Sequence, residues 1–276
     1  MPSLDRILLP VDFSAPSRGA GAYGLALARR FQSQVHIVHV VDARATGAYG
    51  FSGDPDDTAG EAANRELQSF LATESASIPT TRTLLYGDPA RQIAKHARDI
   101  SADLILLPTH GLGGFRRLLL GSVAAKVLHD AECAVWTGVH IEDAPLPPSP
   151  KFDCVMCAVD LDGKSDKYLQ WARDFAQSAG VELAVIHALP AVHETWRPEL
   201  ESEARKRLEE VLGKFGIQAS VVIEFGEVHK AIHTAATRAG ADLLIIGRGV
   251  AAGTLGGLRT HSYAIIRSSP CPVVSI

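Results

Sequence analysis

The sequence predicts an α/β fold built as two tandem Rossmann-like domains, each with a mostly parallel five-stranded sheet flanked by helices. Three observations lead to this prediction. Strand-like and helix-like segments alternate along the 276 residues, and the whole alternating pattern occurs twice. The strand-like segments are also nearly continuous in apolar residues, which is typical of parallel strands that are covered on both faces.

The internal repeat is clearest at the predicted strands. The segment "RILLPVDFS" at 6–14 resembles "CVMCAVDLD" at 154–162, and "ADLILLPTHG" at 102–111 resembles "ADLLIIGRGV" at 241–250. Three further pairs of segments match in the same order along the chain. Repeated blocks in the same order indicate two copies of one domain rather than a chance likeness.

A proline-rich segment, "IEDAPLPPSPKF" at 141–152, separates the two copies. Such a segment is extended and semi-rigid, and it is typical of a linker between domains. We therefore place the boundary near residue 148, with a first domain at 1–147 and a second domain at 148–276.

Apolar runs predict the strands, and amphipathic spacing predicts the helices between them. The third helix of the first copy opens after Gly-Asp-Pro, which is a helix-start signal. In the first copy we expect strands at 6–11, 35–41, 81–86, 103–108 and 133–137, and helices at 15–32, 58–76, 88–99 and 123–131. In the second copy we expect strands at 154–159, 181–188, 220–225, 242–247 and 271–275, and helices at 164–179, 197–214 and 227–238, with a last helix before the final strand.

The composition is that of a soluble globular protein. Hydrophobic residues make up 46% of the chain and charged residues 21%, and the formal net charge is −4. This charge gives no indication of binding to nucleic acid or to an anionic membrane. No apolar run approaches the ~18 residues that a membrane span needs, and the first residues do not resemble a signal peptide. We expect a cytoplasmic protein.

Two of the four cysteines, Cys154 and Cys157, form a C-x-x-C pattern. A redox-active pair of this kind usually opens a helix, whose dipole lowers the thiol pKa. Here the pattern lies inside a strand-like run, so we interpret both cysteines as small apolar residues of a strand.

The loop "PTHGLGGFRRLLLGS" at 108–122 is the strongest candidate for a binding site, because ligands bind beyond the carboxyl ends of strands in such sheets. Glycines bring bare N–H groups close to an anion, and we predict Ser122 as the N-cap of the next helix. The alternative is a glycine-rich connector with solvated arginines. The residues that favour a phosphate site are Gly111, Gly113, Gly114, Arg116, Arg117, Gly121 and Ser122.

The layout resembles the universal stress protein family, in tandem form. ATP-binding members of that family carry G-2x-G-9x-G-[ST] after the fourth strand, and here nine residues separate Gly111 from Gly121-Ser122. The segments "LPVDFS" and "HVVD" resemble the family's first and second strand ends. The likeness covers essentially the whole chain, and it implies domains of the adenine-nucleotide alpha hydrolase-like type.

The resemblance implies an adenine-nucleotide site in the first domain, for ATP, ADP or AMP, with Mg²⁺ allowed as a companion ion. Asp12 would lie near adenosine and Val40 near adenine. Pro108 stands where the family's first motif glycine belongs, and it lacks an N–H. The expected nucleotide-binding residues are Pro10, Asp12, Val40, Gly111, Gly114, Arg116, Gly121, Ser122 and Val123.

The second copy departs further from the motif. Gly247 keeps the first glycine, but Val250 and Arg259 replace the next two. A side chain at 259 would crowd the phosphates, while Thr260 can still cap the helix. The alternative is a structural copy that pairs with the first as two subunits would. The weak candidates for a ligand here are Asp160, Ala188, Gly247 and Thr260.

His229 and His233 stand four residues apart, which places them on one helix face and makes half of a zinc site. The alternative is a pair of exposed or capping histidines, and we predict no complete metal site. His39 and His187 recur at matched positions and are expected to be structural or to lie near the adenine, and not to be catalytic. No catalytic residue is predicted.

These observations favour a stress-response or regulatory protein that binds ATP or a related adenine nucleotide, mainly in the first domain, with little or slow hydrolysis. One alternative is an interaction or dimerisation module without a nucleotide. Another is a slow ATPase that uses Asp12. As partners we expect an intramolecular pseudo-dimer of the two copies and a homodimer of chains, with no nucleic acid and no membrane.

Overall fold

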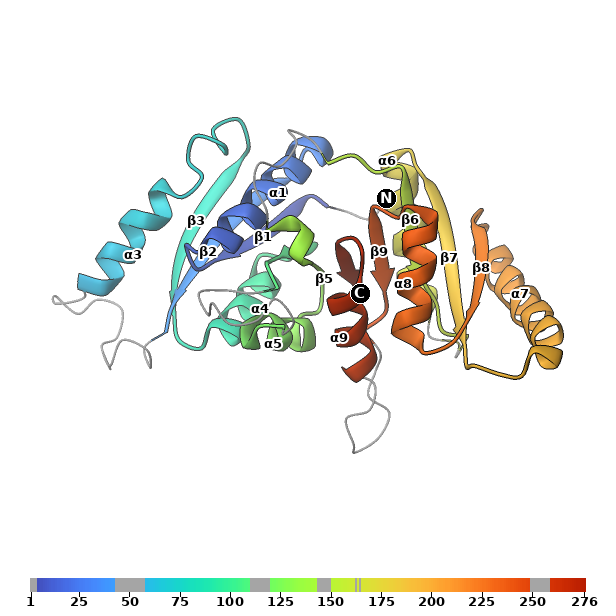
Figure 1. Ribbon diagram of the computed structural model, residues 1–276. Coiled ribbons are helices and arrows are strands. Elements are labelled where there is room, and N and C mark those ends of the chain that lie inside the picture. The colour runs from blue at the N-terminus through green and yellow to red at the C-terminus, as the bar shows by residue number, and fades with distance from the viewer. Residues whose placement is uncertain are drawn as a thin grey trace. The chain divides into compact units, whose positions relative to one another are not determined.

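The computed structural model (Figure 1) describes residues 4–42, 58–109, 120–142, 150–161, 163, 165–248 and 259–276, with the side chains of 259–261 excepted. The chain separates into two compact units, Ser3–Pro150 and Lys151–Ile276, which are called the first and the second domain below. The loop residues Gly111, Gly113, Gly114, Arg116 and Arg117 lie outside the described residues.

The first domain is built on a parallel sheet in the order β3-β2-β1-β4-β5. Every pairing between neighbouring strands in it is parallel. The order reverses between β1 and β4, so the loops after these two strands part there. The strands are β1 (Arg6–Val11), β2 (Gln34–Val41), β3 (Thr80–Tyr86), β4 (Leu104–Leu106) and β5 (Ala134–Thr137).

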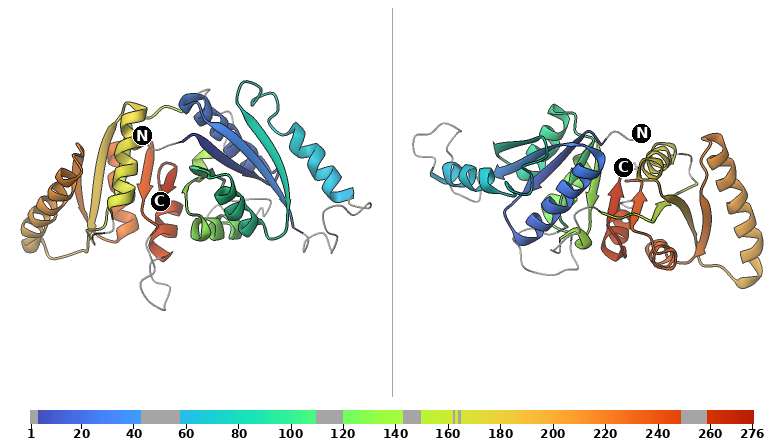
Figure 2. Two further views of the ribbon diagram at one scale, coloured as in Figure 1. Left: turned by 180° about the vertical axis from the view of Figure 1, so that it is seen from behind. Right: turned by 90° about the horizontal axis from the view of Figure 1, so that it is seen from above.

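Helices cover both faces of this sheet, as right-handed crossovers between parallel strands require (Figure 2). Helices α4 and α5 pack against each other, and α1 contacts β1, β2 and β4. The helices of the first domain are α1 (Ala15–Phe31), α3 (Thr58–Ser69), α4 (Pro89–Asp99), α5 (Ser122–Asp130) and the 3-10 turn η1 (Val139–Ile141).

The second domain repeats this arrangement in the order β8-β7-β6-β9-β10, and its strand pairings are again parallel. Helices α8 and α9 pack against each other as α4 and α5 do. The elements are β6 (Cys154–Ala158), α6 (Asp166–Ala179), β7 (Glu182–Leu189), η2 (Glu194–Trp196), α7 (Arg197–Lys214), β8 (Ser220–Phe225), α8 (Val228–Ala239), β9 (Leu243–Ile246), α9 (Arg259–Ser268) and β10 (Val273–Ser275).

The predicted α/β architecture is therefore confirmed, with a five-stranded parallel sheet in each domain. One helix was predicted too long. The helix expected at 58–76 ends at Ser69. Beyond it the backbone hydrogen bonds join residues three apart instead of four: the Phe70 amide donates to the Leu67 carbonyl, and the Ala72 amide donates to the Ser69 carbonyl. Leu71 has a φ of 49°, a left-handed conformation that an α-helix does not continue through.

Apolar side chains of the central strands form the core of each domain. Ile7, Leu8 and Leu9 of β1 are at most 1% exposed, and so are Val155 and Met156 of β6. Burial on both faces explains why these strands are apolar throughout. Cys154 and Cys157 lie on β6 as strand residues, as predicted.

Candidate functional site

The pairing of β1 with β4 stops before Pro10. The β1–β2 register runs on to Val11, whereas the β1–β4 register ends with Leu8 opposite Ile105. The Arg6 carbonyl accepts a hydrogen bond from the amide of Asp103, which precedes β4. Because the backbone groups of a strand point to alternate sides, those of Leu8 and Pro10 also face β4. Proline has no N–H to donate on that side, and the ladder stops where the order of the strands reverses.

The turn that follows β1 holds Asp12 in place. Its carboxylate Oδ1 accepts bonds from the Ser14 amide (3.1 Å) and from the Ser14 hydroxyl (2.5 Å). Ser14 is the N-cap of α1 and accepts a bond from the Ser17 amide, while the Ser17 hydroxyl accepts one from the Asp12 amide at 3.2 Å. Asp12 is half-exposed, so its carboxylate is oriented by the protein and still accessible.

An aromatic cluster stands beside this turn. The Phe13 ring stacks on His39 with centroids 4.3 Å apart and meets Phe70 at 5.7 Å. His39 donates from Nδ1 to the carbonyl of Val11 at 2.7 Å, which supports its predicted structural role. Val40, the predicted adenine contact, follows His39 in β2 and is half-buried. Sequence reasoning missed Phe13. Its φ of 64° is unusual for a bulky residue, and this is a property that only the structure shows.

Glu142 anchors the carboxyl end of β4, and no sequence pattern indicated this contact. Its Oε1 accepts bonds from the Thr109 amide (2.7 Å) and from the Thr109 hydroxyl (2.5 Å). Its backbone also packs so closely on α1 that a Cβ at Gly19 would overlap the Glu142 carbonyl oxygen. This contact requires glycine at position 19.

The amino end of α5 corrects one prediction. Its N-cap is Gly121, in extended conformation with φ −60° and ψ 148°, and not Ser122. The reason is that the first helical bond runs from the Ala125 amide to the Gly121 carbonyl (2.8 Å), so Ser122 already lies inside the helix. The Gly121 amide donates to the Thr109 carbonyl at 2.8 Å and is not available to a ligand.

The next three amides of α5 remain candidates for an anion. Within the described part of the chain, the amides of Ser122, Val123 and Ala124 have no hydrogen-bond acceptor. The first turn holds no acidic residue, and Val123 is 36% exposed. Lys126 in the next turn is paired with Asp88 at 3.0 Å. The helix end is thus electropositive and open at its first turn.

The candidates in the second domain fall into different surroundings. Asp160 is exposed, and Ala188 is half-buried on β7. Gly247 lies under the ring of Tyr168, so its retention has a packing reason: a Cβ there would be 2.6 Å from the ring. Thr260 was predicted as a cap but lies within α9, which already begins at Arg259.

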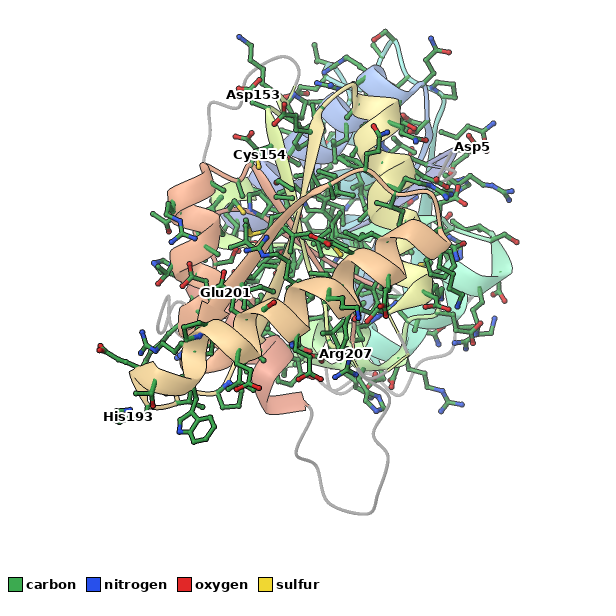
Figure 3. The ribbon with its side chains drawn as sticks, turned by 90° about the vertical axis from the view of Figure 1, so that its right-hand side faces the viewer. Asp5, Asp153, Cys154, His193, Glu201 and Arg207 are labelled. Carbon is green, nitrogen blue, oxygen red and sulfur yellow. The ribbon has the colours of Figure 1, made fainter. Side chains whose placement is uncertain are left out.

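The two histidines proposed as half of a zinc site have separate protein partners. His229 lies 3.3 Å from Glu227, and His233 donates from Nδ1 to the Ser268 carbonyl at 2.5 Å. His193 stands beside the first turn of α7, with Arg207 farther along that helix (Figure 3). Among the residues that the structure describes, no group of three or more potential metal ligands occurs.

The described helices include none whose length and apolar character would let it cross a bilayer.

Comparisons with known proteins agree with this architecture. A universal stress protein from Methanocaldococcus jannaschii is 31% identical over 136 residues, which is 47% of this chain and 79% of that protein. The crystal structure of a universal stress protein from Archaeoglobus fulgidus DSM 4304 matches with a TM-score of 0.71 and 25% identity, over 99% of this chain and 96% of that one. A functionally unknown protein from Pseudomonas aeruginosa PAO1 shares the fold at 18% identity, with a TM-score of 0.68 and coverage of 100% and 93%.

The universal stress protein family matches the sequence twice, at residues 3–137 and again at 151–276. The two matches together take in nearly the whole chain. The structure gives each match its own five-stranded parallel sheet. The chain belongs to the universal stress protein family, and it carries the family's domain in tandem.

Proposed function

We propose that the first domain binds an adenine nucleotide, with the phosphates at the amino end of α5 and the adenosine near Asp12 and Val40. The observation that carries the proposal is the end of the β1–β4 pairing at Leu8 and Ile105, where the order of the strands reverses. Beyond the end of this pairing lie the oriented Asp12 carboxylate and the loop that leads into α5. In open α/β sheets this is the place where ligands bind.

Electrostatics supports the phosphate end of the site. Three α5 amides point along the helix axis, and the positive end of the helix dipole adds to them. The predicted contacts Gly111, Gly114 and Arg116 belong to the loop that leads into this helix. Together these groups suit a di- or triphosphate, which carries charge to match several donors.

Little hydrolysis is expected from such a site, because the three carboxylates that the structure describes around it already accept bonds within the protein. Asp12 holds Ser14, Glu142 holds Thr109, and Asp88 pairs with Lys126. A general base or an acidic Mg²⁺ site works best with a carboxylate that is not already bonded within the protein. We therefore favour binding over turnover, and Mg²⁺ would arrive with the nucleotide.

Calorimetric titration of the full chain with ATP, ADP and AMP tests the proposal, and Ser122→Pro sharpens it. Gly121 has the extended conformation that a residue before proline needs, and the first turn of a helix accepts proline, so the fold is kept while one amide is removed. One lost bond to a charged phosphate costs about 1.5–3 kcal/mol, which is at least a tenfold weaker Kd.

The control is Ser122→Ala, which keeps the amide and removes only the hydroxyl. It should bind ATP within about threefold of wild type, which is under 0.7 kcal/mol. Equal weakening by both variants would move the site away from the α5 amides. Unchanged binding in Ser122→Pro would do the same.

A second candidate function is an interaction module without a nucleotide. It is favoured by the Gly121 amide, which is occupied by Thr109, and by Pro108 at the place of a motif glycine. The absence of heat and of any thermal shift at millimolar ATP, ADP and AMP would select this module. Adenine nucleotide detected by mass spectrometry of the natively purified protein would exclude it.

We further propose that the two domains pair within one chain, that two chains form a dimer, and that the protein acts in a stress response in the cytoplasm. The tandem occurrence of a domain that the family also uses singly supports the internal pair. Light scattering coupled to size exclusion measures the mass of the particle, for which the single chain contributes 29.4 kDa. A particle of one chain mass at micromolar concentration would reject the dimer.

A further inference from the structure

We propose that Tyr168 excludes a nucleotide from the second domain by filling the crevice between β6 and β9, so that the chain has a single nucleotide site. The part of this inference that concerns the nucleotide rests on the proposed function. The part that concerns the position of Tyr168 rests on contacts within the second domain alone.

The first step is that β6 and β9 stay paired where β1 and β4 part. The register runs to Ala158 opposite Ile246, two residues beyond the place that corresponds to Leu8 and Ile105. Ala158 occupies the position of Pro10, 148 residues farther along the chain. It has the N–H that proline lacks, so the ladder continues to the end of both strands.

The second step is the position of the Tyr168 hydroxyl. The Cys154 carbonyl accepts a hydrogen bond from the amide of Asp242, just before β9. Because the backbone groups of a strand point to alternate sides, those of Asp160 also face β9. The Asp160 amide donates to the Tyr168 oxygen at 3.3 Å, which places that oxygen on the β9 side. The hydroxyl donates in turn to Ser165 at 2.6 Å.

The third step is the ring itself. Tyr168 is 9% exposed, and its Cε1 would lie 2.6 Å from a Cβ at Gly247, the residue after β9. The side chain thus reaches from the end of β6 to the end of β9. Burial also raises the pKa of the phenol to about 12, as expected for a hydroxyl removed from water.

The first domain has the opposite distribution of side-chain size. Ala20 stands at the position of Tyr168, and Pro108 at that of Gly247. The Asp12 amide is bonded there by the small Ser17 hydroxyl instead of a phenol. The two domains therefore differ in which element carries the larger residue at this place: Tyr168 on α6 in the second domain, and Pro108 after β4 in the first.

A double-mutant cycle tests the closed crevice without any nucleotide. Gly247→Ala adds a Cβ against the ring, and the glycine has no positive φ that would strain an alanine. We expect it to lower the folding equilibrium constant of the second domain at least tenfold in wild type and less than threefold in Tyr168→Ala. Pulsed hydrogen exchange in urea measures the unfolding of each domain separately, from the deuterium uptake of peptides that belong to that domain.

Tyr168→Phe is the matched control, since it keeps the ring and must keep the full penalty of Gly247→Ala. If Tyr168→Ala does not fold, Tyr168→Leu replaces it in the cycle. Equal penalties in all backgrounds would overturn the proposal, because the ring would not then fill the space over Gly247.

The part that concerns the nucleotide is tested with ATP and hydrogen exchange on the full chain. We expect one ATP per chain, protection of α1 and α5, and no change at the turn after β6. Two ATP per chain, or protection at Asp160, would overturn the proposal. If no ATP binds at all, the proposed function fails, and the cycle at Gly247 alone decides whether Tyr168 closes the second domain.

Discussion

Replacing Asp12 by alanine should destabilise the first domain, because its carboxylate organises the start of α1. The substitution removes two hydrogen bonds, from the Ser14 amide at 3.1 Å and from the Ser14 hydroxyl at 2.5 Å. It also frees the Ser14 side chain that caps the helix.

The size of the effect follows from the number of bonds and their exposure. A buried hydrogen bond to a charged group contributes about 1.5–3 kcal/mol, and Asp12 is only half-buried, so we take about half of that for each bond. The expected loss is about 1.5–3 kcal/mol in the unfolding free energy of the first domain. At about 3 °C per kcal/mol, the melting temperature of that domain should fall by roughly 5–9 °C.

Asp160→Ala is the matched control, because Asp160 holds the same position in the second domain. In the part of that domain which the structure describes, its carboxylate accepts no hydrogen bond, and the residue is exposed. We expect a loss under about 0.5 kcal/mol. Urea unfolding with pulsed hydrogen exchange measures both domains in one sample. If Asp12→Ala costs no more than Asp160→Ala, the reasoning about the Ser14 bonds is wrong.

Two further predictions concern titration. Burial lowers the pKa of His36 and His96 in the folded protein, so as pH falls the unfolded chain binds protons before the folded one does. The contribution of these two histidines to the free energy of unfolding is therefore complete above about pH 6.5, and it is lost as pH falls through their pKa values in the folded protein. Wild type should therefore lose more urea resistance from pH 7.5 to 5.5 than His36→Gln/His96→Gln, and parallel losses would refute this. Burial also raises the pKa of the Cys271 thiol to about 12 and that of Cys157 still further. A disulfide reagent should modify the half-buried Cys133 in the folded protein, Cys154 more slowly because burial raises the pKa of its thiol as well, and Cys157 and Cys271 only in urea; four fast thiols would contradict this burial.

Sequence reasoning predicted the two domains, the parallel sheets and the loops that border the crevice, because these depend on local periodicity and on the repeat. It placed the helix cap at Ser122 because serine is a common N-cap, and no local signal distinguished it from Gly121. Tyr168 and Glu142 were missed for a different reason. Their roles come from contacts with Gly247 and Thr109, which are distant in sequence, and a single chain gives no pattern for such pairs.

The imidazoles of His39 and His187 make the same bond in both domains, each donating from Nδ1 to a strand-end carbonyl, Val11 or Val159, at 2.7 Å. The molecule therefore carries its own spectroscopic reference. In a nitrogen-15 spectrum the two rings share this bond and differ in the stacked Phe13 beside His39, so a ligand that enters the first domain alone should shift the His39 signal and leave the His187 signal in place. A titration followed in this way needs no second sample for comparison.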